Sequence, residues 1–329
     1  MPNLYHPERF QGSADLLHYF EGWYFKLAID EPHNEVVAII PGIALGVDSH
    51  AFIQVISSKE RRSWYVRFPL DSFQAGKKGF SVTVGNNHFS RSSITLSLHQ
   101  SDLDLEANLH LIDLQPFPVT VSSVGVMGWF AYLPAMECKH GVVATRGSAE
   151  GGLRLNNRTV PINSSKVYVE KDWGKSFPKA YIWMQANCFA DPKTSVMLSI
   201  ARIPYLGLRF TGFLGFVQLG DELIRLGTYT SSKIRSLHSS DEEAKVVIAK
   251  GGKLFTFTAR MGSGSHLASP RNGAMDETIV ESVDGLIGLT ITDRSGSMIY
   301  SDESKLAGIE LYKSGSLEQV AAMEAEKKV

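Results

Sequence analysis

The segment "LDLEANLHLID", residues 103 to 113, alternates apolar and polar side chains. Its apolar positions are Leu103, Leu105, Ala107, Leu109 and Leu111, and the polar residues between them are Asp104, Glu106, Asn108 and His110. Successive side chains of a β-strand point to opposite faces of the sheet, so this period of two predicts a strand that is buried on one face. The segment "LFTFTAR", residues 254 to 260, repeats the pattern and predicts a second strand of this kind.

Further segments of strand composition recur about every ten to fifteen residues along the chain. They are "WYFKLAI", "EVVAIIPG", "AFIQVIS", "SWYVRF", "FSVTV", "SITLSL", "GVVATRG", "KVYVE", "YIWMQANCF", "SVMLSIARI", "GLIGLTIT" and "AGIELYK". Turn signals such as Gly251-Gly252 separate them, and a helical period occurs only in the C-terminal "SLEQVAAMEAEKKV". The sequence therefore predicts an antiparallel all-β protein with a short C-terminal helix.

The chain is long enough for two such folds. One barrel of eight to ten strands uses about half of the 329 residues, so we expect two antiparallel β-barrels in tandem. The Gly-rich and polar "EGGLRLNNRTVPINSS" contains the expected boundary, which divides the chain into domains at residues 1–160 and 161–329. The Gly- and Ser-rich residues 263 to 276 are expected to form a long loop.

Composition excludes several classes of function. The 33 basic and 34 acidic side chains leave a net charge of -1, which argues against a nucleic-acid-binding surface. Cys138 and Cys188 are too few for a disulfide scaffold and are expected to be buried free thiols. Residues 1 to 20 lack the apolar core of a signal peptide, and no apolar run reaches the ~20 residues of a membrane-spanning helix. We expect a cytoplasmic protein, with peripheral contact to a membrane left open.

The usual catalytic motifs do not match. Gly174-Lys175-Ser176 resembles the end of a phosphate-binding loop, but Val169 stands where that loop needs its first glycine. Phe177-Pro178 then leads into a strand, so we expect a turn between two strands here. The chain has no Rossmann glycine pattern, and "MGSGSH" carries Gly264 where a nucleophile elbow needs serine. The absence of His-x-His and His-Glu-x-x-His leaves a metal site unsupported.

Two neighbouring strands carry the strongest candidates for a site. Alternation along residues 166 to 172 places Tyr168, Glu170 and Asp172 on one face, with the two carboxyl groups roughly 7 Å apart. Burial and like charge raise the pKa of a carboxyl group, which suits a general acid near neutrality. The next strand has two faces, an apolar one and one formed by Tyr181, Trp183, Gln185 and Asn187. The latter fits the wall of a ligand cavity and a solvent-facing strand side equally well.

Two further clusters combine aromatic and ionisable residues. In "FEGWYFKL", residues 20 to 27, Trp23 suits packing at the closed end of a barrel, and Glu21 beside Tyr24 must find a partner or become protonated. In "MGWFAYLPAMECKHG", residues 127 to 141, Glu137 and His140 interrupt an apolar segment. A single histidine of this kind is more often a satisfied core or surface residue than a catalyst.

These clusters together resemble the tocopherol cyclase family. The matching segments are "FEGWYFKL", "MGWFAYLPAMECKHGVVATRG", "YVEKDWGKSFPKAYIWMQANCF", "LASPRNGAMDETIVESVDGLIGLTI" and "SKLAGIELYK", in the order of the family and over most of the chain. The resemblance implies a tandem lipocalin-like fold that is shared with carotenoid hydratase-like proteins. It also implies a lipophilic small-molecule substrate.

Tocopherol cyclases close a chromanol ring by protonating an alkene on the prenyl tail of a quinol, with no cofactor or metal required in principle. This resemblance implies an intramolecular lyase of the isomerase class, or a hydratase, and a non-catalytic carrier of a hydrophobic molecule is the alternative. It implies that Glu170 is the acid, with Asp172 next in line. The expected substrate-binding residues are Glu21, Trp23, Tyr24, Trp173, Trp183, Gln185 and Asn187, with Glu137, His140, Tyr168 and Lys171 as weaker candidates.

The chain departs from the plant enzymes at three points. It has Asp172 where they commonly have asparagine and Lys175-Ser176 where they have a glycine-rich pair, and we expect it to carry no plastid-targeting leader. These departures concern the substrate more than the fold. Strand alternation also directs Lys171 to the face opposite Glu170, so we expect it to pair elsewhere.

Overall fold

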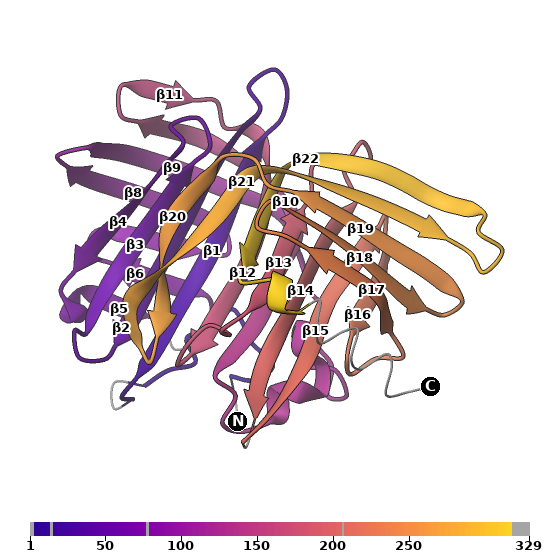
Figure 1. Ribbon diagram of the computed structural model, residues 1–329. Coiled ribbons are helices and arrows are strands. Elements are labelled where there is room, and N and C mark those ends of the chain that lie inside the picture. The colour runs from indigo at the N-terminus through magenta and orange to yellow at the C-terminus, as the bar shows by residue number, and fades with distance from the viewer. Residues whose placement is uncertain (1–2, 14–15, 77–78, 206, 318–329) are drawn as a thin grey trace. The chain divides into compact units, whose positions relative to one another are not determined.

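The structure is a computed structural model that describes residues 3–13, 16–76, 79–205 and 207–317. The chain forms two antiparallel sheets and divides into two compact units (Figure 1). The first unit comprises Met1–Gly125, Cys138–Phe177 and Leu267–Thr278. The second comprises Val126–Glu137, Pro178–His266 and Ile279–Val329. The predicted all-β class is confirmed.

The first sheet has twelve strands within the described residues, in the order β4-β3-β2-β1-β12-β10-β9-β8-β7-β6-β5, with β11 paired to β10. Their bounds are β1 (Tyr19–Ile29), β2 (Glu35–Leu45), β3 (His50–Ser57), β4 (Arg62–Phe68), β5 (Phe73–Ala75), β6 (Ser81–Val84), β7 (Asn87–Ser90), β8 (Ser93–Gln100), β9 (Leu103–Pro116), β10 (Cys138–Leu155), β11 (Arg158–Val160) and β12 (Asn163–Gly174). A short 3-10 helix, η1 (Leu70–Ser72), connects β4 to β5.

The second sheet has ten strands within the described residues, in the order β16-β15-β14-β13-β22-β21-β19-β18-β17, with β20 paired to β21. Their bounds are β13 (Tyr181–Ala186), β14 (Ser195–Tyr205), β15 (Leu208–Leu219), β16 (Glu222–Gly227), β17 (Lys233–Ser239), β18 (Glu243–Lys250), β19 (Lys253–Arg260), β20 (Gly264–Arg271), β21 (Ala274–Thr292) and β22 (Met298–Tyr312). The 3-10 segment η2 (Gly125–Tyr132) precedes β10 in the chain.

Alternating apolar residues produce the core of each sheet. The apolar positions of β9, from Leu103 to Leu111, are buried, whereas Asn108 and His110 between them are exposed. Strands at opposite ends of the first sheet, such as β4 with Trp64 and β6 with Val82, contribute to one core cluster. The second sheet likewise brings apolar residues of its two end strands, β16 and β17, into a single cluster. Each sheet therefore curls around its own core, as the sequence predicts.

The division of the chain differs from the expected boundary at 160/161. β12 follows that boundary but pairs with β1 and β10, and its Val167 and Val169 belong to the first core. The first unit therefore continues to Phe177 and also includes residues 267 to 278. A hairpin of β20 and β21 replaces the long loop expected at residues 263 to 276, because Ser-rich segments still pair when backbone partners are available.

The remaining expectations on the fold are met in part. Cys138 and Cys188 are free cysteines, as expected, but both are half-buried rather than buried. The chain turns helical at residues 315 to 317, and the rest of the predicted C-terminal helix lies outside the described residues. Among the described residues, no helix has the length and apolar character to cross a membrane.

Candidate acid–base site

β12 places the candidate carboxyl groups on one face of the first sheet. Its neighbours are β1, where Tyr24 lies opposite Glu170, and β10, where His140 lies opposite Asp172. Cross-strand partners in an antiparallel sheet project from the same face. Since Tyr168, Glu170 and Asp172 alternate along β12, all five side chains occur on one face, as the alternation predicts for the three residues of β12.

His140 lies between the two carboxyl groups. Its Nδ1 is 2.8 Å from Asp172 Oδ1, and its Nε2 is 3.2 Å from Glu170 Oε2. The Tyr168 hydroxyl donates a hydrogen bond of 2.6 Å to the same Glu170 oxygen. The four side chains therefore form a continuous hydrogen-bonding cluster, which we call the acid–base cluster: Tyr168, Glu170, His140 and Asp172.

The acid–base cluster is largely enclosed, and its charges are strongly coupled. Tyr168 is fully buried and Glu170 is 4% exposed. Burial disfavours the imidazolium form of His140, but the charges of Asp172 and Glu170 outweigh burial and hold the pKa of His140 well above its usual value. Burial and the adjacent Glu170 also raise the pKa of Tyr168 well above its usual value, so its hydroxyl remains a proton donor. The two carboxyl groups therefore favour the protonated form of His140.

This arrangement can store and transfer protons. A carboxylate that binds one ring nitrogen fixes the tautomer and orientation of an imidazole, and here Asp172 directs Nε2 of His140 toward Glu170. The same three residues could also offer a ligand atom each to a divalent cation, since those atoms lie within 4.8 Å of one another. Both ring nitrogens of His140 already face carboxyl oxygens, however, and this favours proton transfer over metal ligation.

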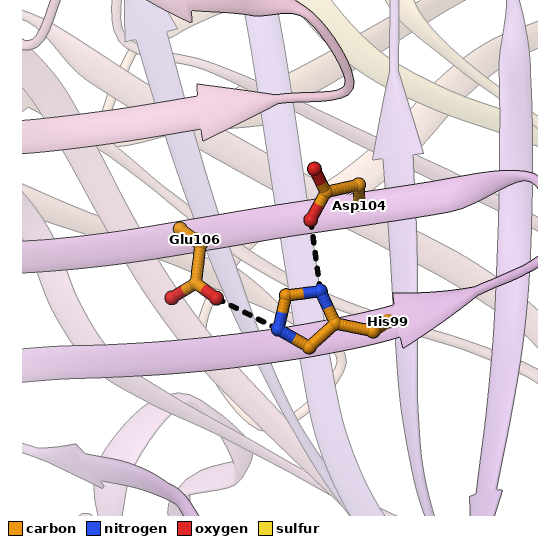
Figure 2. Close-up of side chains that lie close together, drawn as sticks. All are labelled: His99, Asp104 and Glu106. Atoms are coloured by element: carbon orange, nitrogen blue, oxygen red, sulfur yellow. Dashed lines mark hydrogen bonds and ion pairs between the residues drawn. The ribbon is translucent and has the colours of Figure 1, made fainter.

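A second group of similar composition lies on β8 and β9 (Figure 2). Both ring nitrogens of His99 approach carboxylates, Asp104 Oδ1 and Glu106 Oε1, each at 2.8 Å. The side chain of His99 is 60% exposed, in contrast to 11% for His140. Arg154 also hydrogen bonds to Asp104, which lowers the pKa of that carboxyl group, while burial opposes this shift. This group is a solvent-facing set of ion pairs, and Arg154 already supplies it with a positive charge.

The segment that contains the acid–base cluster matches the profile of a known family. A profile of the family described as tocopherol cyclase-like matches residues 116–210, which include His140, Glu170 and Asp172. The chain resembles the tocopherol cyclase-like family. A probable chloroplastic tocopherol cyclase of Oryza sativa subsp. japonica is 28% identical over 120 residues, which are 36% of this chain and 22% of the rice protein. The chloroplastic tocopherol cyclase of Zea mays matches to the same extent, so the match spans about a fifth of either relative.

Solved structures share the fold at low sequence identity. A candidate AttH protein from Nitrosomonas europaea aligns with a TM-score of 0.57 and 14% identity, over 93% of this chain and 96% of that protein. CghA, solved with Sch210972, aligns with a TM-score of 0.58 and 8% identity, over 90% of this chain and 88% of CghA. Kievitone hydratase from Nectria haematococca gives 0.50 and 12%, over 88% of both chains. These likenesses support the tandem lipocalin-like architecture.

Two of the expected aromatic wall residues lie on the other face of the sheet. Trp23 and Trp173 alternate with the residues that face the acid–base cluster, and their rings lie 5.0 and 4.6 Å from the Lys171 ammonium. Lys171 is 2.7 Å from Glu21 Oε1, and both side chains are fully buried. This corrects the expectation that Trp23, Trp173 and Glu21 line the site with Glu170, because strand alternation separates them from it.

Glu21 is instead the centre of a structural network. Its carboxylate accepts hydrogen bonds from the backbone N–H of Gln11 at 3.0 and 2.9 Å and of Gly12 at 3.1 Å, and from the Tyr19 hydroxyl. Burial lowers the pKa of Lys171, and the charge of Glu21 opposes this shift. Glu21 and Lys171 thus pair with each other, and this pair supplies the partner that the sequence analysis expected for each residue. Their pair anchors the N-terminal residues to β1.

The residues predicted on β13 belong to the second unit. Ile182 and Met184 are part of the second core cluster, whereas Trp183 and Gln185 project from the other face, as the alternation predicts. Trp183 is 6% exposed, Gln185 is fully buried, and Asn187 follows the end of β13. The expected solvent-facing alternative is therefore excluded for this strand. Glu137 is half-buried and directly precedes β10.

Sequence reasoning missed two residues beside the acid–base cluster. Lys26 lies opposite Tyr168 in register and is fully buried on the face of the acid–base cluster. The alternation that places Tyr24 on this face extends to Lys26 and could have identified it. Cys138 lies with Sγ 3.7 Å from Asp172 Oδ1. No local pattern points to Cys138, because its position depends on the register of β10 with β12.

Proposed function

We propose that the chain is a cofactor-free cyclase or hydratase of a lipophilic substrate, similar to tocopherol cyclase. Its substrate would be a prenylated quinol or a related terpenoid lipid with a trisubstituted alkene. The observation that carries the proposal is the buried acid–base cluster within the segment that matches the tocopherol cyclase-like family. The architecture shared with CghA and kievitone hydratase is consistent with this class of chemistry.

Proton transfer is sufficient for such a reaction. The proton of the cluster passes from His140 to Glu170, whose carboxyl group gives it to the less substituted alkene carbon, and the π electrons form the new C–H bond. A lone pair of the phenol oxygen then closes a C–O bond to the tertiary cation, and the phenolic proton returns to the acid–base cluster. In a hydratase, water would supply the oxygen instead. Neither route changes an oxidation state, and water is the only further reactant, in the hydratase route alone.

The neighbours of Glu170 suit this role. His140 Nε2 lies 3.2 Å from Glu170 and can return a proton to it after each turnover. Asp172 keeps the imidazole oriented, and the Tyr168 hydroxyl donates a hydrogen bond to the Glu170 oxygen that also faces His140. Burial excludes competing water from the cluster, which an alkene-protonating acid requires. Glu170 and His140 would therefore act as catalytic residues, with Asp172 and Tyr168 as positioning residues.

A substitution at Glu170 tests the proposal. We expect Glu170→Gln to retain the fold and the binding of a prenylated hydroquinone while it lowers turnover by roughly a hundredfold or more. Product formation would be followed by chromatography and mass spectrometry. Glu106→Gln, at an exposed carboxylate on β9, is the matched control and should turn over at the parental rate. Parental turnover by Glu170→Gln would remove Glu170 as the proton donor.

The same experiment separates the carrier alternative. A carrier would bind the prenylated hydroquinone and release it unchanged in the wild-type protein as well as in both variants. Binding can be followed separately from turnover by titration of intrinsic tryptophan fluorescence. Tight binding without product in the wild-type protein, across several prenylated hydroquinones, would assign the chain as a lipophile carrier.

A further inference from the structure

The acid–base cluster contains two contacts between a carboxyl group and an imidazole nitrogen, and they differ in length. Nδ1 of His140 lies 2.8 Å from Asp172 Oδ1 with hydrogen-bond geometry, whereas Nε2 lies 3.2 Å from Glu170 Oε2. Both contacts belong to the first unit and to one face of its sheet. The difference matters because a proton fits between atoms at either distance, whereas a metal ion needs ligand atoms that are further apart.

The longer contact has the geometry of two zinc ligands. Nitrogen and oxygen ligands lie roughly 2.0–2.1 Å from Zn²⁺ in a tetrahedral arrangement. At these bond lengths, ligand atoms 3.2 Å apart subtend about 100–105° at the metal, close to the tetrahedral angle of about 109°. Atoms 2.8 Å apart would subtend only about 85–90°. His140 Nε2 and Glu170 Oε2 can therefore occupy neighbouring corners of one zinc tetrahedron, while the contact with Asp172 remains a hydrogen bond.

Hydrogen bonds already orient both of these ligands. A histidine that binds zinc usually donates its other ring N–H to a carboxylate, which fixes the tautomer of the imidazole. Asp172 is placed to accept this bond from Nδ1 of His140. A ligating carboxylate is usually hydrogen bonded as well, and Glu170 accepts a bond of 2.6 Å from the Tyr168 hydroxyl. The groups that surround the ligands of a zinc site are thus present in the folded chain.

The charges and the ligand types of the cluster select the kind of metal. Glu170 and Asp172 lie on either side of one imidazole, and the two positive charges of Zn²⁺ would balance their two negative charges. Imidazole nitrogen suits zinc, whereas Mg²⁺ and Ca²⁺ prefer sites made of oxygen ligands. The side chain of Asp172 is 25% exposed, so an ion can reach the cluster from solvent.

The surface group of His99, Asp104 and Glu106 consists of the same residue types but lacks these features. Both of its contacts to His99 measure 2.8 Å, the distance that corresponds to the narrower angle. Arg154 already balances part of its negative charge, and the side chain of His99 is 60% exposed to competing water. Ligand spacing and burial therefore favour the acid–base cluster over the surface group as a zinc site.

We propose that the acid–base cluster binds Zn²⁺ through Nε2 of His140 and a carboxylate oxygen of Glu170, with Asp172 orienting the imidazole and water completing the coordination. Both ligands must be deprotonated, so the ion replaces the proton of the cluster. Zinc would then act as an inhibitor, because Glu170 has no proton to give while it holds the ion. The inhibition rests on the proposed function, whereas the binding does not.

Titration calorimetry with zinc chloride tests the site in the full-length protein, freed of any histidine tag. We expect one ion per chain. Asp172→Asn should weaken binding roughly tenfold, as the loss of an orienting group does, and His140→Gln and Glu170→Gln should weaken it further. His99→Gln is the matched control and should bind like the parent. The proposal fails if the parent binds no zinc, or if His99→Gln loses the ion while His140→Gln keeps it.

X-ray absorption of the zinc-loaded parent is a second measurement that does not depend on the folding of a variant. We expect one imidazole nitrogen together with oxygen atoms at roughly 2.0–2.1 Å from the metal. Cys138, whose Sγ lies 3.7 Å from Asp172 Oδ1, is the alternative ligand that the spectrum can detect. A sulfur neighbour at roughly 2.3 Å, or a shell of oxygen alone, would overturn the assignment.

Inhibition is measured separately from binding. If the parent converts a prenylated hydroquinone, saturating zinc should stop product formation, and a chelator should restore it. Zinc that binds as described without loss of turnover would overturn the inhibition and the role of Glu170 as the proton donor, but not the site. A chain without turnover would contradict the proposed function alone, because calorimetry decides the zinc site by itself.

Discussion

At the scale of single residues, His140 decides the protonation of the candidate site. A histidine with one carboxylate neighbour has a modestly raised pKa, whereas His140 has two within 3.2 Å in a buried position. Two carboxyl groups that close to each other would otherwise repel. The imidazolium form of His140 therefore stabilises the folded cluster by offsetting this repulsion.

This coupling predicts a pH-dependent contribution to stability. Because the folded pKa of His140 is raised above its unfolded value of about 6.5, its contribution is complete below that pH and is lost as pH rises through the folded pKa. We expect His140→Gln to lower the free energy of unfolding by about 3 kcal/mol between pH about 5 and 6.5, and by progressively less at higher pH. Urea unfolding over a pH series measures the difference.

His99→Gln is the control for this prediction. His99 contacts two carboxylates at similar distances but in an exposed position, where solvent screens the charges (Figure 2). We expect little change in stability at any pH in this range. A His140→Gln penalty that stayed constant from pH about 5 to 9 would show that packing, and not the imidazolium charge, accounts for the effect.

The residue scale also shows what a sequence pattern can and cannot specify. The alternation along β12 is sufficient to place Tyr168, Glu170 and Asp172 on one face, since it depends only on the strand itself. The contact between His140 and Asp172 depends on how β10 and β12 are aligned, across 32 residues of chain. No local period encodes that alignment. The family resemblance likewise groups Trp23 with Glu170, whereas the register of β1 with β12 places it on the other face.

At the scale of elements, η2 depends on one glycine. The backbone of Gly128 occupies a region that is essentially restricted to glycine, and a Cβ would collide with the Tyr229 ring. We expect Gly128→Ala to lower the free energy of unfolding by about 1–3 kcal/mol, measured by chemical denaturation with tryptophan fluorescence. Gly152→Ala is the comparison, since a Cβ there would meet nothing within 4 Å, and it should cost less. Equal penalties would contradict the role of the Tyr229 contact.

Elements differ in how readily the sequence reveals them. β9 and β19 are evident because one face meets the core and the other meets solvent, which imposes a strict period of two. β20 and the start of β21 differ from the expected loop, which was based on the Gly- and Ser-rich composition of residues 263 to 276. Their strand structure comes from backbone pairing and from contacts with residues far away in sequence, and composition alone does not encode these.

At the scale of the whole molecule, the first unit includes a segment that follows most of the second unit in the sequence. Residues 267 to 278 belong to the first unit. The Gln54 side chain both donates to and accepts from the backbone of Ala268, at 3.1 and 3.0 Å. The backbone N–H of Gly273 donates to Lys175 at 2.7 Å, and that of Phe177 to Pro270 at 3.1 Å. This segment is therefore part of the first fold and secures the end of β12.

We therefore expect a fragment of residues 1 to 177 to be incomplete without this segment. It should unfold at a lower temperature than the same unit in the intact chain, and a peptide of residues 264 to 278 should raise its midpoint in a concentration-dependent manner. Gly273→Val in the peptide is the control, because Gly273 has φ 83° and a Cβ would lie 2.3 Å from the Leu45 carbonyl oxygen. Thermal unfolding followed by circular dichroism measures both effects. The opposite outcome is a fragment that unfolds at the same temperature as the intact chain and whose unfolding midpoint the peptide leaves unchanged. It would show that the first unit folds without residues 267 to 278. The expected domain boundary near residue 160 would then need to move only to the end of β12.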